Sequence, residues 1–117
     1  MEEGQARRAL GQAHRLLGQF EQAEDELRRS LAILEAQDSA YEVGLTWVDL
    51  AYLCAARAEA AGDDMAEPLH AQALAHCGRA GEIFERLGAR LDLGETRALC
   101  KKIEETCNNS SRRHSQG

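Results

Sequence analysis

The sequence predicts an all-α fold built from antiparallel helical hairpins, and three observations support this prediction. Proline occurs once among 117 residues and aromatic residues make up 4% of the chain, so residue types that favour strands or break helices are scarce. Small and apolar residues recur every three or four positions, which is the spacing of one helix face. Glycine and aspartate interrupt this spacing at intervals, which predicts about five helices joined by short turns.

The first hairpin is predicted over about residues 3–37, as two amphipathic helices that meet at Gly18. Each helix carries a stripe of small and apolar residues, and charged residues fall outside the stripe of the second helix. Glu24 and Arg28 lie four residues apart, a spacing that supports an exposed helix by about 0.2–0.5 kcal/mol. Helices joined by so short a turn pack antiparallel. The stripes consist of Ala6, Ala9, Leu10, Ala13, Leu16 and Leu17, and of Ala23, Leu27, Ser30, Leu31 and Leu34.

The second hairpin is longer and is predicted over about residues 40–87. Asp38 and Ser39 precede its first helix, and either side chain can cap the free N–H groups there. Pro68 fits the first turn of the second helix, where its missing N–H is not required. Gly88 suits the left-handed backbone that commonly ends a helix.

A capping helix over about residues 92–107 is predicted to complete a single helical domain, residues 1–107. Leu99 and Ile103 belong to its apolar stripe. From Asn108 onward the sequence contains no apolar residue, so this segment has no face to bury. Residues 108–117 are therefore predicted to be a disordered tail.

Charge and hydropathy exclude several classes of partner. Fourteen Lys and Arg against twenty Asp and Glu leave a net charge of −6, which disfavours nucleic acids and anionic membranes as partners. No apolar run approaches the roughly 18–20 residues that span a bilayer, and the N-terminus lacks a signal-peptide apolar region. These features predict a soluble cytoplasmic protein. Four scattered cysteines without a C-x-x-C pair are expected to be reduced packing residues.

The sequence offers no candidate catalytic site. It lacks a recognisable nucleophile with a base, a carboxylate pair and a G-x-G-x-x-G phosphate loop. His70 and His76 are six residues apart and fall on different faces of a helix, whereas ligands on one helix need a spacing of three or four. We therefore expect no enzymatic activity, no metal and no cofactor. A metal or thiol sensor built on Cys54, Cys77 and His76 is the least favoured alternative.

An internal repeat relates two parts of the chain. The segment SLAILEAQDSAYEVGLT, which begins at Ser30, aligns with AGEIFERLGARLDLGET, which begins at Ala80, at an offset of 50 residues. The same helix face therefore recurs, which is the signature of a helical repeat protein. The identical pairs are Ile33/Ile83, Glu35/Glu85, Gly44/Gly94 and Thr46/Thr96.

These residues resemble the tetratricopeptide repeat (TPR) family, over about residues 4–107. In that family a Leu-Gly or Leu-Ala pair lies in the first helix, a Gly marks the turn, and small, large and small residues follow in the second helix. The resemblance implies stacked hairpins that form a short solenoid. The offset of 50 residues departs from the usual repeat of about 34 residues, and the proline common at the end of a repeat is absent. The matching positions are Leu10-Gly11, Gly18, Phe20, Ala23, Leu27 and Ser30, then Trp47, Leu50-Ala51, Ala73, Cys77 and Ala80.

The resemblance also implies a function. The segment IFERLGARLDLGETRAL is similar to the last repeats of long bacterial regulatory proteins, which implies either a C-terminal part of such a protein or a small stand-alone relative. Peptide-binding members use a concave surface lined by first helices, which implies a scaffold for a peptide or helix of a protein partner. The alternative is a homodimerisation or spacer element, in which a second copy covers the open end of the first hairpin. The implied partner-binding residues are Gln5, Arg8, Gln12, Arg15, Leu45, Val48, Asp49 and Tyr52.

Overall fold

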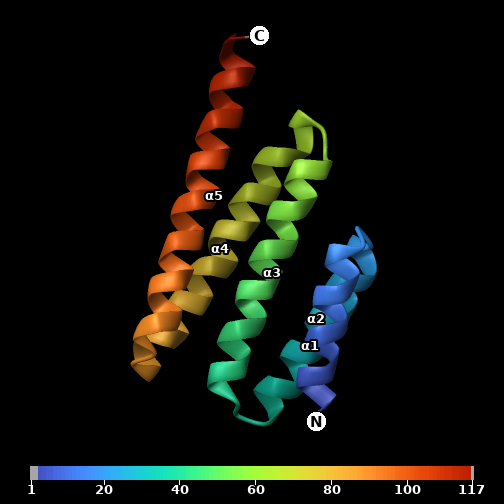
Figure 1. Cartoon of the computed structure of the whole chain (residues 1–117), viewed down its shortest axis with the longest axis vertical. Helices are drawn as coiled ribbons and strands as arrows, with labels where there is room; N and C mark the ends of the chain where they lie inside the picture. The colour runs from blue at the N-terminus through green and yellow to red at the C-terminus, as the bar shows by residue number, and fades with distance from the viewer. Residues whose placement is uncertain (1–2, 117) are drawn as a thin grey trace.

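The computed structural model describes the backbone of residues 3–116, and the side chains of residues 3–62 and 64–108. Over this range the chain forms five α-helices and no strand, which confirms the predicted all-α class (Figure 1). The helices are α1 (Glu3–Leu16), α2 (Phe20–Ala36), α3 (Ala40–Ala60), α4 (Asp63–Leu87) and α5 (Arg90–Gln116). No helix in the described range is long and apolar enough to cross a membrane.

Consecutive helices pack against each other, and α3 lies at the centre of the molecule. Figure 1 shows α1 and α2 on one side of α3 and α4 and α5 on the other. The two predicted hairpins correspond to the pairs α1–α2 and α3–α4. The resulting body is flat, with extents of 49 × 30 × 17 Å.

Two clusters of buried side chains form the core. The first joins α2, α3 and α4 and contains Leu27, Leu34, Leu50 and Phe84, each 1% exposed. Every stripe residue predicted for the second helix of the first hairpin is buried, which confirms that face. The second cluster joins α3, α4 and α5 and consists of Ala51, Cys54, Ala73, Cys77, Leu99 and Ile103.

The stripe predicted for the first helix does not pack in the hairpin. Leu10 and Leu16 of α1 are 49% and 76% exposed, and α1 instead buries Gly4 and Gly11. A Cβ atom on Gly11 would lie 2.6 Å from Leu27, so the backbone of α1 approaches α2 more closely than any other residue would allow. This close approach turns the opposite, leucine-bearing face of α1 outward.

The turns follow the predictions at the glycines but not at the predicted cap. Gly18 and Gly88 both have positive φ angles, of 77° and 70°. Ser39 is the N-cap of α3, yet its side chain makes no capping hydrogen bond. The turn is closed by backbone bonds instead, because the Ser39 N–H donates to the Leu34 carbonyl at 3.0 Å and the Val43 N–H donates to the Ser39 carbonyl at 2.9 Å.

The last two helices differ from the predicted boundaries. Helix α4 begins at Asp63, so Pro68 lies in its second turn, not its first. The carbonyl that loses its partner belongs to Asp64, an exposed residue at the helix start, where water can replace the missing N–H. Helix α5 runs to Gln116 and so includes residues 108–116, which were predicted to be disordered. Helical backbone bonds along this segment require no apolar face.

Candidate functional site

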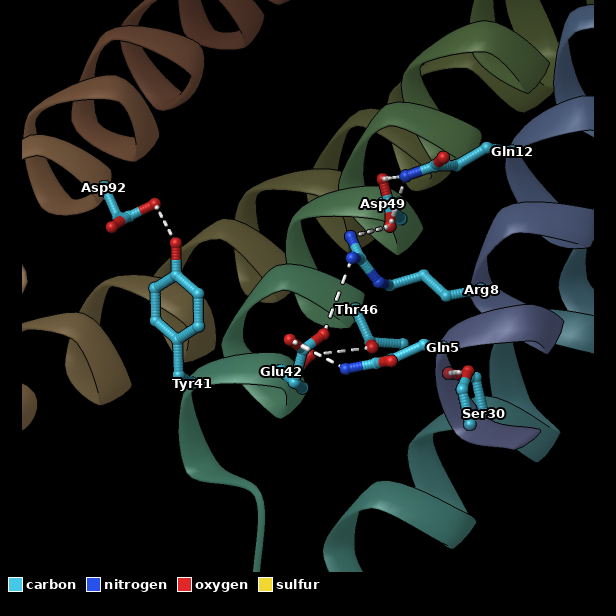
Figure 2. A network of polar contacts seen from close by, with 10 residues as sticks. Gln5, Arg8, Gln12, Ser30, Tyr41, Glu42, Thr46, Asp49 and Asp92 are labelled. Atoms are coloured by element: carbon cyan, nitrogen blue, oxygen red, sulfur yellow. Dashed lines mark hydrogen bonds and ion pairs between the residues drawn. The ribbon is translucent and has the colours of Figure 1, made fainter. Parts of the chain in front are cut away.

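Polar side chains connect α1 to α3 in a continuous network (Figure 2). Arg8 donates to Asp49 at 3.4 Å and to Glu42 at 3.5 Å. Gln12 Nε2 lies 3.1 Å from both carboxylate oxygens of Asp49, and Gln5 donates to Glu42 at 3.3 Å. Four of the eight predicted partner-binding residues, Gln5, Arg8, Gln12 and Asp49, are thus engaged in holding the two helices together.

The Asp49 carboxyl is the most buried member of this network. Only 7% of the residue is exposed, and burial raises the pKa of its carboxyl above the ordinary value of 3.8. The hydrogen bond from Gln12 and the charge of Arg8 act in the opposite direction without cancelling the effect of burial. A buried carboxylate is costly without partners, so the network is part of the α1–α3 interface.

The other four predicted residues, Arg15, Leu45, Val48 and Tyr52, line two cavities between α3 and α5. The smaller cavity, of about 140 Å³, is lined by Leu45, Val48, Tyr52, Phe84, Asp92, Glu95, Thr96 and Leu99. The larger cavity, of about 240 Å³, is lined by Arg15, Tyr52, Ala55, Ala56, Glu59, His70, Leu99, Lys102, Ile103 and Thr106. We call the surface lined by both sets the α3–α5 groove.

Tyr52 stands at the middle of the α3–α5 groove, because it and Leu99 line both cavities. Its side chain is 42% exposed, and the guanidinium carbon of Arg15 lies 5.4 Å from the centroid of its ring. This distance allows a cation–π contact. Helix α1 therefore reaches the groove through Arg15, while Gln5, Arg8 and Gln12 contact residues of α3.

Sequence reasoning missed the contribution of α5 to this groove. The resemblance implies first helices as the binding surface, but the predicted binding residues come from α1 and α3 alone, and α5 is predicted to be a capping helix. The internal offset of 50 residues carries the missing signal, because it places Leu45, Asp49 and Tyr52 on Glu95, Leu99 and Lys102. All three of these α5 residues line the groove.

The two ends of the α3–α5 groove differ in charge. Asp92 and Glu95 lie at the smaller cavity, and the Tyr41 hydroxyl donates to Asp92 at 3.1 Å (Figure 2). That hydrogen bond is the main cause of the raised pKa of Tyr41. Arg15 and Lys102 lie at the larger cavity with one acidic residue, Glu59. The groove is thus acidic at one end and carries an excess of basic groups at the other.

A further cavity of about 480 Å³ opens between α2, α3 and α4 beside Trp47. Arg79 and Arg28 lie 4.9 and 5.9 Å from the centroid of the Trp47 ring, and the ring of His76 lies 5.3 Å away. Burial, followed by the charges of these two arginines, lowers the pKa of His76. The tryptophan is therefore already covered by side chains of the chain itself.

The cysteine and histidine residues of the sensor alternative do not form a cluster with ligand geometry. In the part of the chain that the structure describes, no group of three or more His, Cys, Asp and Glu residues could hold a metal ion. Burial raises the pKa of Cys77 to about 12, with a smaller contribution from a hydrogen bond to Cys100, and burial also raises the pKa of Cys54. Both thiols are thus kept in their unreactive protonated form.

Comparison with family models, with curated proteins and with solved structures finds no match to this chain. What the fold and site define together is an all-α protein with an open groove between two of its helices. The function of this groove is inferred from its own residues and contacts.

Proposed function

We propose that this chain is a protein–protein interaction module that binds a peptide or helix of a partner in the α3–α5 groove. The observation that carries the proposal is the exposed Tyr52 between two adjoining cavities with apolar walls. An amphipathic segment binds to such a surface by placing its apolar face in a groove between helices. The proposal retains the predicted scaffold function but places the binding surface between α3 and α5, and no longer on α1 and α3.

Tyr52 and Arg15 have the properties of binding hot spots. Tyrosine and arginine are the residue types that, with tryptophan, contribute most often to binding energy at protein interfaces. The Arg15 guanidinium already stacks near the Tyr52 ring, so the pair is partly ordered before a partner arrives. Leu45, Val48 and Leu99 supply apolar contact beside them.

The proposed role is binding without catalysis. Cys54 and Cys77, the buried nucleophiles of the core, do not line the groove and have raised pKa values. Polar groups that do line it, such as Glu59 and Lys102, come from separate helices and suit recognition of a charged segment. The chain would act as one module of a larger assembly.

The proposal is tested with peptides selected on the chain from a random display library. Their affinity is then measured by titration calorimetry for the parent, Tyr52→Ala and Leu87→Ala. Leu87 is a matched control, because it is 48% exposed but lies outside the groove. We expect Tyr52→Ala to weaken binding by about tenfold or more, the effect of losing one hot-spot residue. Equal affinities for all three chains would rule out the groove as the binding site.

A second candidate function, self-association, is favoured by the outward face of α1. In the TPR-like pattern, Leu10-Gly11 of the first hairpin matches Leu50-Ala51 of the second. The same alignment pairs Leu10 with Leu50 and Ala13 with Leu53, both in α3. Leu50 and Leu53 are buried in the core cluster that includes residues of α2. Helix α1 thus exposes the face that α3 uses for packing. A second copy of the chain is the occupant we propose for it.

A further inference from the structure

We infer that the larger cavity of the α3–α5 groove is a pocket for the carboxylate of an acidic side chain on the partner segment. This inference rests on the proposed function, because it specifies the chemistry of the segment that binds in the same groove. It follows from the size of the cavity, from buried nitrogen atoms of its lining residues that lack partners, and from the charges of its lining residues.

The volume of the cavity suits one side chain. At about 240 Å³ it is smaller than the roughly 300–1,000 Å³ of typical small-molecule sites. Ala55, Ala56 and Ile103 are among its lining residues and provide apolar walls. Such walls match the methylene stem of a glutamate, whose polar end then meets the polar part of the lining.

Two residues that line this cavity each carry a buried nitrogen atom without a hydrogen-bond partner among the described residues. These atoms are Nδ1 of His70, a residue that is 3% exposed, and Nε of Arg15. An arginine Nε–H can only donate, and a histidine nitrogen donates in one of its two neutral tautomers and in its charged form. A carboxylate is an acceptor of the kind that both side chains lack among the described residues.

The charges favour an anion over a cation. Arg15 and Lys102 line the cavity together with Glu59, so these three side chains carry a net positive formal charge. Within the described residues neither Arg15 nor Lys102 forms an ion pair. Their charges are therefore available to a ligand. Tyr52 adds a hydroxyl group that can donate to the same carboxylate, whereas the Thr106 hydroxyl already donates to the Lys102 carbonyl at 3.0 Å.

The opposite end of the groove gives the bound segment a direction. Asp92 and Glu95 line the smaller cavity, which would repel a carboxylate and attract a basic side chain. A partner segment with an acidic residue near His70 and a basic residue near Glu95 therefore satisfies both ends. The reverse orientation places like charges together at both ends.

The inference is tested by NMR titration of the full chain with blocked amino acids. The probe is N-acetyl-glutamate methylamide, with the glutamine and lysine analogues as the uncharged isostere and the opposite charge. We expect the glutamate probe to shift the His70 ring signals saturably and to bind at least about fivefold more tightly than the glutamine probe, because hydrogen bonds to a charged group are stronger. Equal shifts with glutamate and glutamine would overturn the inference.

Two lysine variants provide a matched control for the charge. Lys102 lines the cavity, whereas its exposed neighbour Lys101 does not. Lys102→Gln should lose most of the glutamate-specific binding, and Lys101→Gln should retain it, although both change the net charge equally. Because both side chains are exposed, neither change is expected to unfold the chain. Equal losses in the two variants would show a general charge effect and contradict the pocket.

The peptides selected for the proposed function separate its failure from the failure of this inference. Each acidic residue of a selected peptide is replaced by its amide, and affinity is compared on the parent and Lys102→Gln chains in a double-mutant cycle. If Tyr52→Ala weakens binding but no acidic residue couples to Lys102, the groove stands and the carboxylate pocket is wrong. If Tyr52→Ala has no effect, the proposed function itself fails.

Discussion

Asp49 is the residue whose environment differs most from what its type suggests. A carboxyl group in a helix normally faces water, yet this one is buried between α1 and α3 and its partners are Arg8 and Gln12. Arg8 also contacts Glu42 at 3.5 Å, so it keeps one acidic partner without Asp49. Burial and pairing therefore compete at this residue, and the raised pKa indicates that burial has the larger effect.

We predict that Asp49→Asn leaves the chain at least as stable as the parent near neutral pH. Because the pKa of Asp49 is raised in the fold, folding favours the protonated form, so this group contributes stability that is present below its unfolded pKa and is lost as pH rises through its folded pKa. An asparagine at position 49 does not titrate, so the variant does not lose this stability as pH rises. The free energy of unfolding, from urea titrations at several pH values, should show the variant gaining on the parent as pH rises.

The exposed pair of Asp25 and Arg29 is the control for this change. These side chains are 59% and 57% exposed, so Asp25→Asn should alter stability by less than about 1 kcal/mol. If pairing outweighed burial at Asp49, the asparagine variant would instead lose about 3–5 kcal/mol, as when one partner of a buried ion pair is removed. That result would contradict the prediction.

At the scale of helices, glycines set how closely pairs approach. A Cβ on Gly44 of α3 would lie 2.7 Å from Cε1 of Phe84 in α4, and Phe84 is 1% exposed. Gly94 of α5 occupies the equivalent position at the internal offset, and a Cβ there would meet nothing within 4 Å. Equivalent glycines therefore have different roles, because α4 packs on α3 at this position and no described helix packs on α5 there.

We predict opposite effects for alanine at these two glycines. Gly44→Ala should destabilise the chain by about 1–3 kcal/mol, because the new methyl group would overlap the buried Phe84 ring and push it out of its packed position. Gly94→Ala should stabilise it by roughly 0.5–1 kcal/mol, since alanine is the better helix former and meets no obstacle. Thermal melts of both variants measure this difference. A similar change in melting temperature for the two would show that the α3–α4 contact is looser than described.

At the scale of the whole molecule, the two ends of the helix array differ in polarity. The offset places Trp47, Ala51 and Cys54, which are buried in α3, on exposed charged residues of α5, namely Arg97, Lys101 and Glu104. Helix α5 therefore presents a polar outer face that suits water. Helix α1 presents Leu10 and Leu16 at the other end, where no described helix covers them.

We predict that the chain self-associates through α1. Sedimentation equilibrium should give twice the chain mass for the parent and the single mass for Leu10→Glu, because a charge at the centre of an apolar face is costly to bury. Leu91→Glu is the control, since Leu91 is 84% exposed at the start of α5, away from that face. A parent that remains monomeric over a wide range of concentration would contradict this prediction and leave the groove as the remaining candidate function.

Features that depend on residues close together in the chain were predicted correctly, whereas features that depend on contacts between helices were not. The buried stripe of α2, the turn at Gly18 and the left-handed helix end at Gly88 follow from spacing and from glycine itself, and all three were predicted. The orientation of α1 was predicted wrongly, because residue spacing alone favours its leucine stripe as the buried face. Only the contacts of Gly4 and Gly11 with α2 show which face turns inward.

The sequence by itself determined the all-α class, the number of helices and most of their boundaries, since these depend on residue spacing and on turn residues close together in the chain. The candidate site depended on packing between distant segments. Gln5, Arg8 and Gln12 were predicted as partner-binding residues, and the tertiary structure places them against Glu42 and Asp49. The groove beside Tyr52 exists because α5 packs on α4 next to α3, and no local pattern specifies that contact.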